Sequence, residues 1–89
     1  MPQHQIALFT FTLGRAESIG PQALRRLWTI ASGSREVSVG RRESQWGDGN
    51  RPVYTLYAPQ GLANLREVEL RLRHALEGAH LHASLTMMP

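Results

Sequence analysis

Two histidines separated by one residue, His80 and His82, have the spacing closest to a metal or acid–base site. On a strand, alternate side chains share a face and lie about 6–7 Å apart. Neutral imidazole binds zinc, copper or nickel, and histidine is a general base near neutral pH. The local sequence supplies no third ligand, nucleophile or paired carboxylate. We therefore predict no metal, no cofactor and no catalytic residue, and interpret both histidines as structural or solvent-facing.

A second group of residues is basic and aromatic. The segment RRESQWGDGNRPVY, residues 41–54, contains Arg41, Arg42 and Arg51 around Trp46. The planar arginine fork suits phosphates and carboxylates, and an aromatic ring stacks on nucleic-acid bases. The segment also contains the Asp-Gly pair that is typical of a tight hairpin turn. Its interpretation is therefore open between a binding loop and a turn with a charged, solvated rim.

The loop LGRAESIGP, residues 13–21, adds one arginine next to a predicted helix start. A helix N-terminus attracts anions, so Arg15 would strengthen an anion site there. The loop matches neither G-x-G-x-x-G nor a P-loop, and an ordinary strand–helix connection is the alternative. The predicted nucleic-acid or anion site consists of Arg15, Arg41, Arg42, Trp46 and Arg51.

Composition limits the class of protein. The chain has 89 residues, no cysteine, and a net charge of +3 from ten arginines and seven acidic residues. Without cysteine there is no disulfide or thiolate site, and the charge is a mild bias toward anionic partners. The apolar runs are far shorter than the roughly 20 residues of a membrane span, and the N-terminus does not resemble a signal peptide. We expect a cytoplasmic protein that does not enter a membrane.

Hydrophobic periodicity defines the elements that must position these residues. A central strand begins the chain, and Pro21 fits the first turn of a helix. Asn64 followed by Glu67 resembles a capping box at the start of a second helix, which Gly78 ends. The pattern predicts strands at about 5–13, 35–44, 53–58 and 80–87, and helices at about 21–32 and 64–78.

The resulting order, βαββαβ, resembles that of ferredoxin-like domains. It implies one α+β domain over residues 1–89, with a four-stranded antiparallel sheet and two helices on one face. Right-handed crossovers give the strand order 4-1-3-2. This topology places the predicted anion site, His80 and His82 at one end of the sheet. Because this fold carries many unrelated functions, the order alone assigns none.

The face of the sheet away from the helices is expected to be mostly neutral and partly apolar. An exposed apolar patch would favour a symmetric homodimer through this face. The expected residues of the open face are Ile6, Leu8, Thr10, Thr12, Ser38, Thr55, Tyr57, His80, His82, Ser84 and Thr86.

These features favour a small binding or regulatory module over an enzyme. The expected partner is anionic, either nucleic acid or an acidic protein surface, and it engages the arginine-flanked hairpin. One alternative is a small-molecule site or enzyme on the open face that uses Tyr57, His80 and His82. Another is a structural protein-interaction domain without a small ligand.

Overall fold

The computed structural model describes residues 5–14, 17–44, 51–61 and 64–88, and its elements follow the order βαββαβ. The elements are β1 (Gln5–Leu13), α1 (Pro21–Ser32), β2 (Ser38–Ser44), β3 (Arg51–Pro59), α2 (Leu65–Gly78) and β4 (Ala83–Met87). The first strand and first helix have the predicted ranges, β2 and β4 begin later than predicted, and β3 is longer at both ends.

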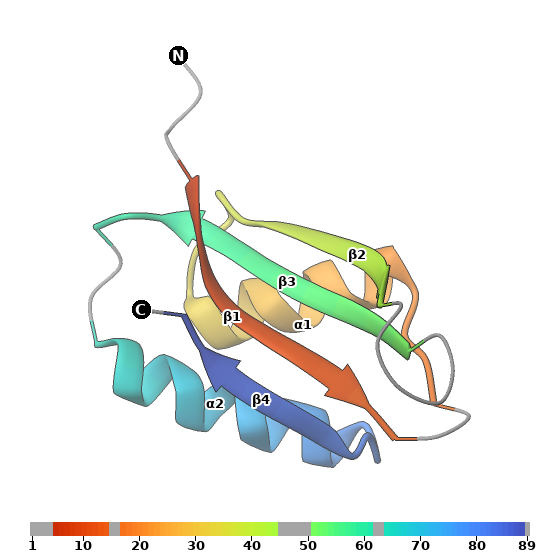
Figure 1. Cartoon of the computed structure of the whole chain (residues 1–89). Coiled ribbons are helices and arrows are strands. Elements are labelled where there is room, and N and C mark those ends of the chain that lie inside the picture. The colour runs from red at the N-terminus through yellow and green to blue at the C-terminus, as the bar shows by residue number, and fades with distance from the viewer. Residues whose placement is uncertain (1–4, 15–16, 45–50, 62–63, 89) are drawn as a thin grey trace.

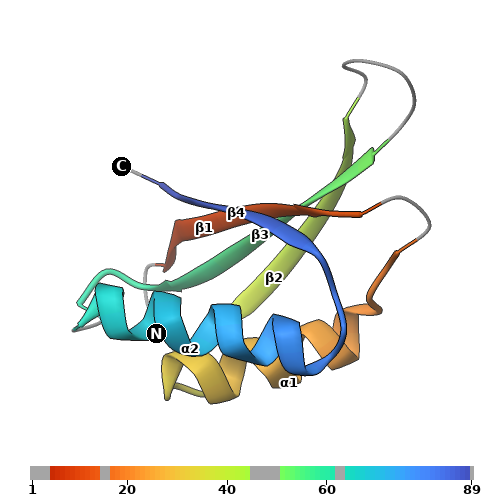
Figure 2. The same cartoon turned by 90° about the horizontal axis from the view of Figure 1, so that it is seen from below.

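The four strands form one antiparallel sheet in the order β2-β3-β1-β4. The expected order 4-1-3-2 counts the strands from the opposite edge, and β1 and β3 are the central strands. Both helices lie against one face, and no helix or strand of the described residues covers the other face (Figures 1 and 2). The chain is therefore an α+β structure of two layers.

The core fills the space between the helices and the sheet. Trp28 of α1 is fully buried, its ring meets Phe9 edge-on at 5.8 Å, and its Nε1 donates to the Tyr57 carbonyl at 2.9 Å. Phe11 and Tyr54 stack with ring centroids 5.0 Å apart. The two contacts of Trp28 join α1 to both central strands, so the position of α1 over the sheet is fixed by directional as well as apolar interactions.

A β-bulge in β1 overturns part of the predicted face assignment. Ala7 pairs with Tyr57 and Phe9 with Leu56, which leaves Leu8 as an extra residue between the two pairs. An extra residue changes which side chains face the core. Leu8 is buried, and Ile6 packs against the core, so both belong to the helix-covered face. A strict alternation of faces along β1 assigned both residues to the open face because it allows for no extra residue in the strand.

The open face therefore carries mainly hydroxyl groups. Thr86, Thr10, Thr55 and Gly40 form a row across all four strands, and Thr12 pairs with Ser84. Tyr57 lies over Gly40, where an added Cβ would meet its ring at 3.3 Å. Without Ile6 and Leu8, this face is less apolar than the sequence predicts.

The segment after α2 is a helix termination, and the predicted strand start at His80 is wrong. His80 has a φ of 59°, its N–H bonds to the Glu77 carbonyl, and the Leu81 N–H bonds to the Leu76 carbonyl. This is a Schellman motif, with His80 in the left-handed position that glycine usually occupies. The backbone turns here, so β4 begins only at Ala83.

The start of α2 also differs from the prediction. Asn64 is the N-cap residue, but it has φ 56° and ψ 55° and makes no side-chain capping bond. A capping side chain requires an extended backbone at this position. The predicted capping box between Asn64 and Glu67 is therefore absent.

Candidate functional site

The β2–β3 hairpin extends past the rest of the sheet. Its pairing with β1 ends at Phe11 with Tyr54, but β2 and β3 remain paired through Arg42 with Val53 and Ser44 with Arg51. Figure 2 shows this end of the hairpin curving away from the helices. We call residues 42–44 and 51–53 the hairpin arm. Because β1 does not flank the arm, Pro52 removes no hydrogen bond from a central ladder.

Two of the predicted arginines lie on opposite faces of β2. Arg41 pairs with the buried Tyr54, and its guanidinium lies 6.0 Å from the centroid of that ring on the helix side. Arg42 pairs with Val53 and belongs to the open face. Arg41 also forms an ion pair with Glu43 at 3.5 Å, and about half of each side chain is exposed. The two arginines therefore serve different surfaces.

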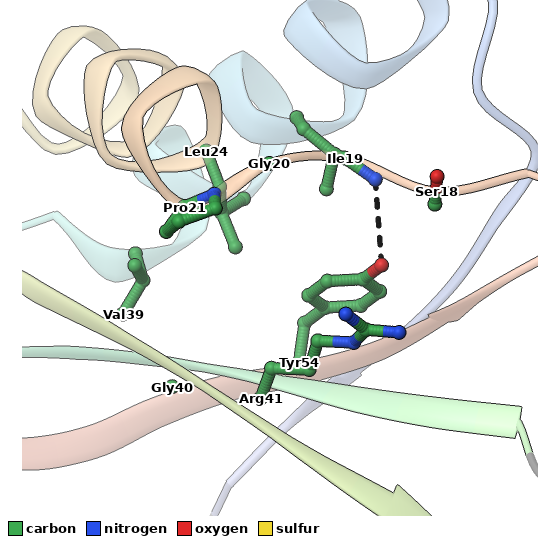
Figure 3. Close-up of a pocket in the computed structure, with 9 residues that line it drawn as sticks. All are labelled: Ser18, Ile19, Gly20, Pro21, Leu24, Val39, Gly40, Arg41 and Tyr54. Atoms are coloured by element: carbon green, nitrogen blue, oxygen red, sulfur yellow. Dashed lines mark hydrogen bonds between the residues drawn. The ribbon is translucent and has the colours of Figure 1, made fainter.

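A pocket lies next to Arg41, between the start of α1 and strands β2 and β3. Its volume is about 360 Å³. Figure 3 shows the Arg41 guanidinium and Ser18 toward one end and Val39 and Pro21 toward the other. We call it the Arg41 pocket. Its lining residues are Ser18, Ile19, Gly20, Pro21, Leu24, Val39, Gly40, Arg41 and Tyr54.

Tyr54 supplies a buried polar group to this pocket. Its side chain is 1% exposed, and its hydroxyl accepts a long hydrogen bond of 3.4 Å from the Ile19 N–H (Figure 3). The hydroxyl carries one proton of its own, which it can donate to an acceptor in the pocket. An acceptor in the pocket that takes this proton would form a hydrogen bond that is largely shielded from water.

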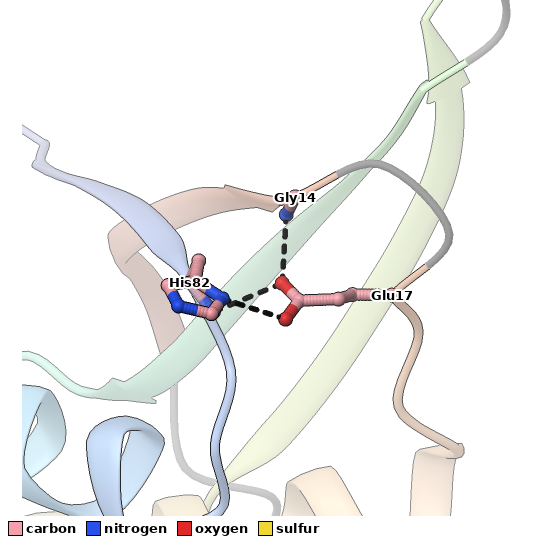
Figure 4. Close-up of polar contacts among 3 residues, drawn as sticks. All are labelled: Gly14, Glu17 and His82. Carbon is pink, nitrogen blue, oxygen red and sulfur yellow. Dashed lines mark hydrogen bonds and ion pairs between the residues drawn. The ribbon is translucent and has the colours of Figure 1, made fainter.

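Glu17 and His82 form the second polar arrangement at this end of the sheet (Figure 4). Glu17 Oε1 accepts from the backbone N–H groups of Gly14 and His82 at 3.0 and 2.9 Å, and its Oε2 lies 2.8 Å from His82 Nδ1. The hydrogen bond from the His82 ring, followed by that from the His82 backbone, lowers the pKa of Glu17, and partial burial opposes this shift. The carboxylate thus ties the β1–α1 loop to the chain entering β4.

This pair has the geometry that orients an imidazole, but the described residues do not complete a metal site around it. A carboxylate that holds one ring nitrogen leaves the other for a proton or a metal. Among residues 5–14, 17–44, 51–61 and 64–88, no group of three His, Cys, Asp or Glu side chains could hold a metal ion. The His82 side chain is 87% exposed. In the structure, the contact of His82 with Glu17 holds the β1–α1 loop against the segment that precedes β4.

The structure does not bring the alternative small-molecule site together. Tyr57 pairs with Ala7 near the start of β1, whereas Ala83, next to His82, pairs with Leu13 at its end. This separation is about 20 Å along the sheet. His80 lies in the turn that ends α2 and does not share a strand face with His82. These three residues do not form one site.

Two predicted site residues, Arg15 and Trp46, lie outside the described residues, as does the predicted Asp48-Gly49 turn. Arg51 is described only as a strand residue at the end of the hairpin arm. Sequence reasoning missed Glu17, Ser18 and Tyr54 as residues of this end. Their spacing in the chain gives no local signal, since each acquires its role from a distant segment.

Comparison of the chain with protein-family models, curated proteins and solved structures finds no match. In the described part of the chain, no helix combines the length and apolar character needed to cross a membrane. The functional interpretation therefore depends on the geometry of the hairpin end.

Proposed function

We propose that the protein is a small binding module whose hairpin arm engages nucleic acid. The observation that carries this proposal is the extension of the β2–β3 hairpin beyond β1, with Arg42 on its open face. A two-stranded ribbon fits the major groove of duplex DNA. A projecting ribbon can therefore approach a partner without interference from the rest of the sheet.

Charge supports the same proposal. The segment 41–54 has three arginines against Glu43 and Asp48. Arginine binds phosphate oxygens in a bidentate geometry and stacks on bases. Trp46 lies in the connecting segment of the sequence and would add a stacking surface. An acidic protein surface would use the same arginines and is the second candidate partner.

The finer structural assignments belong to this proposal. A ferredoxin-like fold is supported by the order βαββαβ, the central position of β1 and β3 and the single helical layer. A homodimer through the open face has less support, since Ile6 and Leu8 face the helices. Tyr57 and Val53 are the larger apolar groups that such a dimer would cover. A cytoplasmic location fits a nucleic-acid partner.

Fluorescence anisotropy with labelled single- and double-stranded oligonucleotides tests the proposal. Binding should weaken steeply with salt because each phosphate contact releases counterions. Arg42→Ala should lower the affinity and reduce the slope of log K against log salt by about one unit. Arg71→Ala, which removes the same charge from α2, is the matched control. An absence of binding at low salt, or equal binding by the Arg42 and Arg71 variants, would reject the arm as the site.

A further inference from the structure

The Arg41 pocket has a size and position that suit a ligand other than a nucleic-acid strand. Its volume of about 360 Å³ is within the range of small-molecule sites, about 300–1,000 Å³. It lies on the helix side of β2, where Arg41 faces α1, whereas Arg42 belongs to the open face. A ligand in this pocket would therefore occupy a surface separate from the one proposed for the hairpin arm.

One end of the pocket is apolar. Val39, Pro21 and Leu24 lie together at that end in Figure 3. Val39 is only partly buried although it packs against the core. Covering it with a ligand would remove apolar surface from water. This end therefore fits a hydrocarbon or aromatic group.

The other end is polar and positive. The Arg41 guanidinium lies there with Ser18 and the Tyr54 hydroxyl (Figure 3). Tyr54 is only 1% exposed, and its hydroxyl, which accepts from the Ile19 N–H, can still donate its own proton. Arg41 contacts Glu43 at 3.5 Å, which leaves guanidinium donors for another acceptor. Both groups donate hydrogen bonds, so the matching ligand group is an oxygen acceptor with negative charge.

The start of α1 adds to the positive potential. The N-cap Gly20 makes no side-chain cap, and the first turn of α1 contains no acidic residue. The unbonded N–H groups of a first turn favour an anion. This contribution supports the assignment, which rests on the pocket, Arg41 and the buried Tyr54 hydroxyl.

We propose that the Arg41 pocket binds a small amphipathic carboxylate, with its carboxylate at Arg41 and Tyr54 and its apolar body against Val39 and Leu24. The pocket has the volume of about a dozen water molecules at about 30 Å³ each. A ligand of roughly a dozen non-hydrogen atoms is therefore the expected size. Glu43 competes with the carboxylate for Arg41 and moderates the affinity.

Phenylacetate, 2-phenylethanol and acetate form a matched set of probes. Phenylacetate has both the apolar body and the charge, whereas each of the others has one of the two. In NMR titrations of the full chain, phenylacetate should shift the amide signals of Ile19, Val39, Arg41 and Tyr54. The other two probes should bind at least about tenfold more weakly, because each lacks one half of the recognition.

Variants then assign the contacts. Arg41→Ala should weaken phenylacetate binding by about tenfold or more, and Tyr54→Phe by several-fold, since it removes only the hydroxyl. Glu43→Gln should strengthen binding by removing the competing carboxylate. Arg71→Ala is the control with the same charge change as Arg41→Ala. Native-like amide spectra of each variant establish that a loss of binding does not reflect unfolding.

Several results would overturn the assignment. The first is the absence of phenylacetate shifts up to about 10 mM, a concentration that corresponds to a binding free energy of about −3 kcal/mol. The second is a set of shifted amides that lies away from the pocket. The others are equal binding of 2-phenylethanol and phenylacetate, and unchanged phenylacetate binding by Arg41→Ala. Oligonucleotide binding, with its dependence on Arg42, is measured separately. The two experiments therefore show separately whether the proposal for the pocket fails and whether the proposal for the hairpin arm fails.

Discussion

Glu17 holds His82 through both its backbone and its ring, although 65 positions separate them in the sequence. The same carboxylate also accepts the Gly14 N–H at the end of β1. One acidic side chain thus joins the loops at which β1 ends and β4 approaches. These hydrogen bonds lie at the same end of the sheet as the hairpin arm and the Arg41 pocket.

The Glu17 contacts predict an acid-dependent loss of stability. The pKa of Glu17 is lowered in the folded state from its ordinary value of 4.5, so its contribution is fully present above 4.5. It is lost as the pH falls through the lowered pKa, where the carboxylate takes up a proton. Urea unfolding from neutral pH down to below that value should therefore show a steeper acid-side loss in the native protein than in Glu17→Gln.

Glu77→Gln is the control for this effect. Glu77 is exposed on α2, and its side chain makes no ion pair with the described residues. This variant should retain the acid-side slope of the native protein. If Glu17→Gln and the native protein lose stability in parallel, the Glu17–His82 contact does not contribute to the pH dependence.

His80→Gly should stabilise the protein. His80 occupies the left-handed C-terminal position of α2, with φ 59°, where a side chain is strained. Glycine adopts this conformation without that strain, so the free energy of unfolding should rise by about 0.5–1 kcal/mol. Chemical denaturation measures the difference. His74→Gly replaces an exposed residue in the middle of α2 and should instead lower the free energy of unfolding by about 1 kcal/mol. A destabilised His80→Gly variant would contradict the Schellman motif.

Trp28→Phe should be strongly destabilising despite the aromatic replacement. Trp28 is fully buried, and its Nε1 donates to the Tyr57 carbonyl at 2.9 Å. Phenylalanine leaves that carbonyl without its donor and leaves a small cavity beside Phe9, with an expected total cost of about 2–4 kcal/mol. Denaturant unfolding followed by far-UV circular dichroism gives the value. A cost below about 1 kcal/mol would show that the indole hydrogen bond is dispensable.

Leu8→Ala and Thr10→Ala together test the β-bulge. Leu8 is buried on the helix-covered face, so its truncation should cost about 2–4 kcal/mol. Thr10 is on the open face, and its truncation should change the stability by less than about 1 kcal/mol. Both free energies come from urea unfolding. Similar small costs for the two variants would restore the simple alternation in β1 and remove the bulge.

Local patterns in the sequence predicted the elements more closely than their ends. The apolar, aromatic run of β1 and the apolar stripes of both helices are local properties of the sequence, so the existence and order of these elements can be predicted from it. The end of α2 was predicted at Gly78, a helix-breaking residue, but the chain then continues through a Schellman motif at His80. The choice of the left-handed residue depends on contacts such as Leu76 with Leu81, which local propensity does not specify.

The features of the candidate site likewise fall into two groups, those that the sequence indicates and those that only the fold brings together. The sequence by itself determined the arginine-rich hairpin, the βαββαβ order and the absence of cysteine chemistry, because each is a property of composition or short-range spacing. Only the tertiary structure decided that Arg41 and Arg42 serve different surfaces, that Leu8 turns inward, and that Glu17 reaches His82. These relationships arise where segments far apart in the chain meet, and the packing of the whole sheet and both helices selects them.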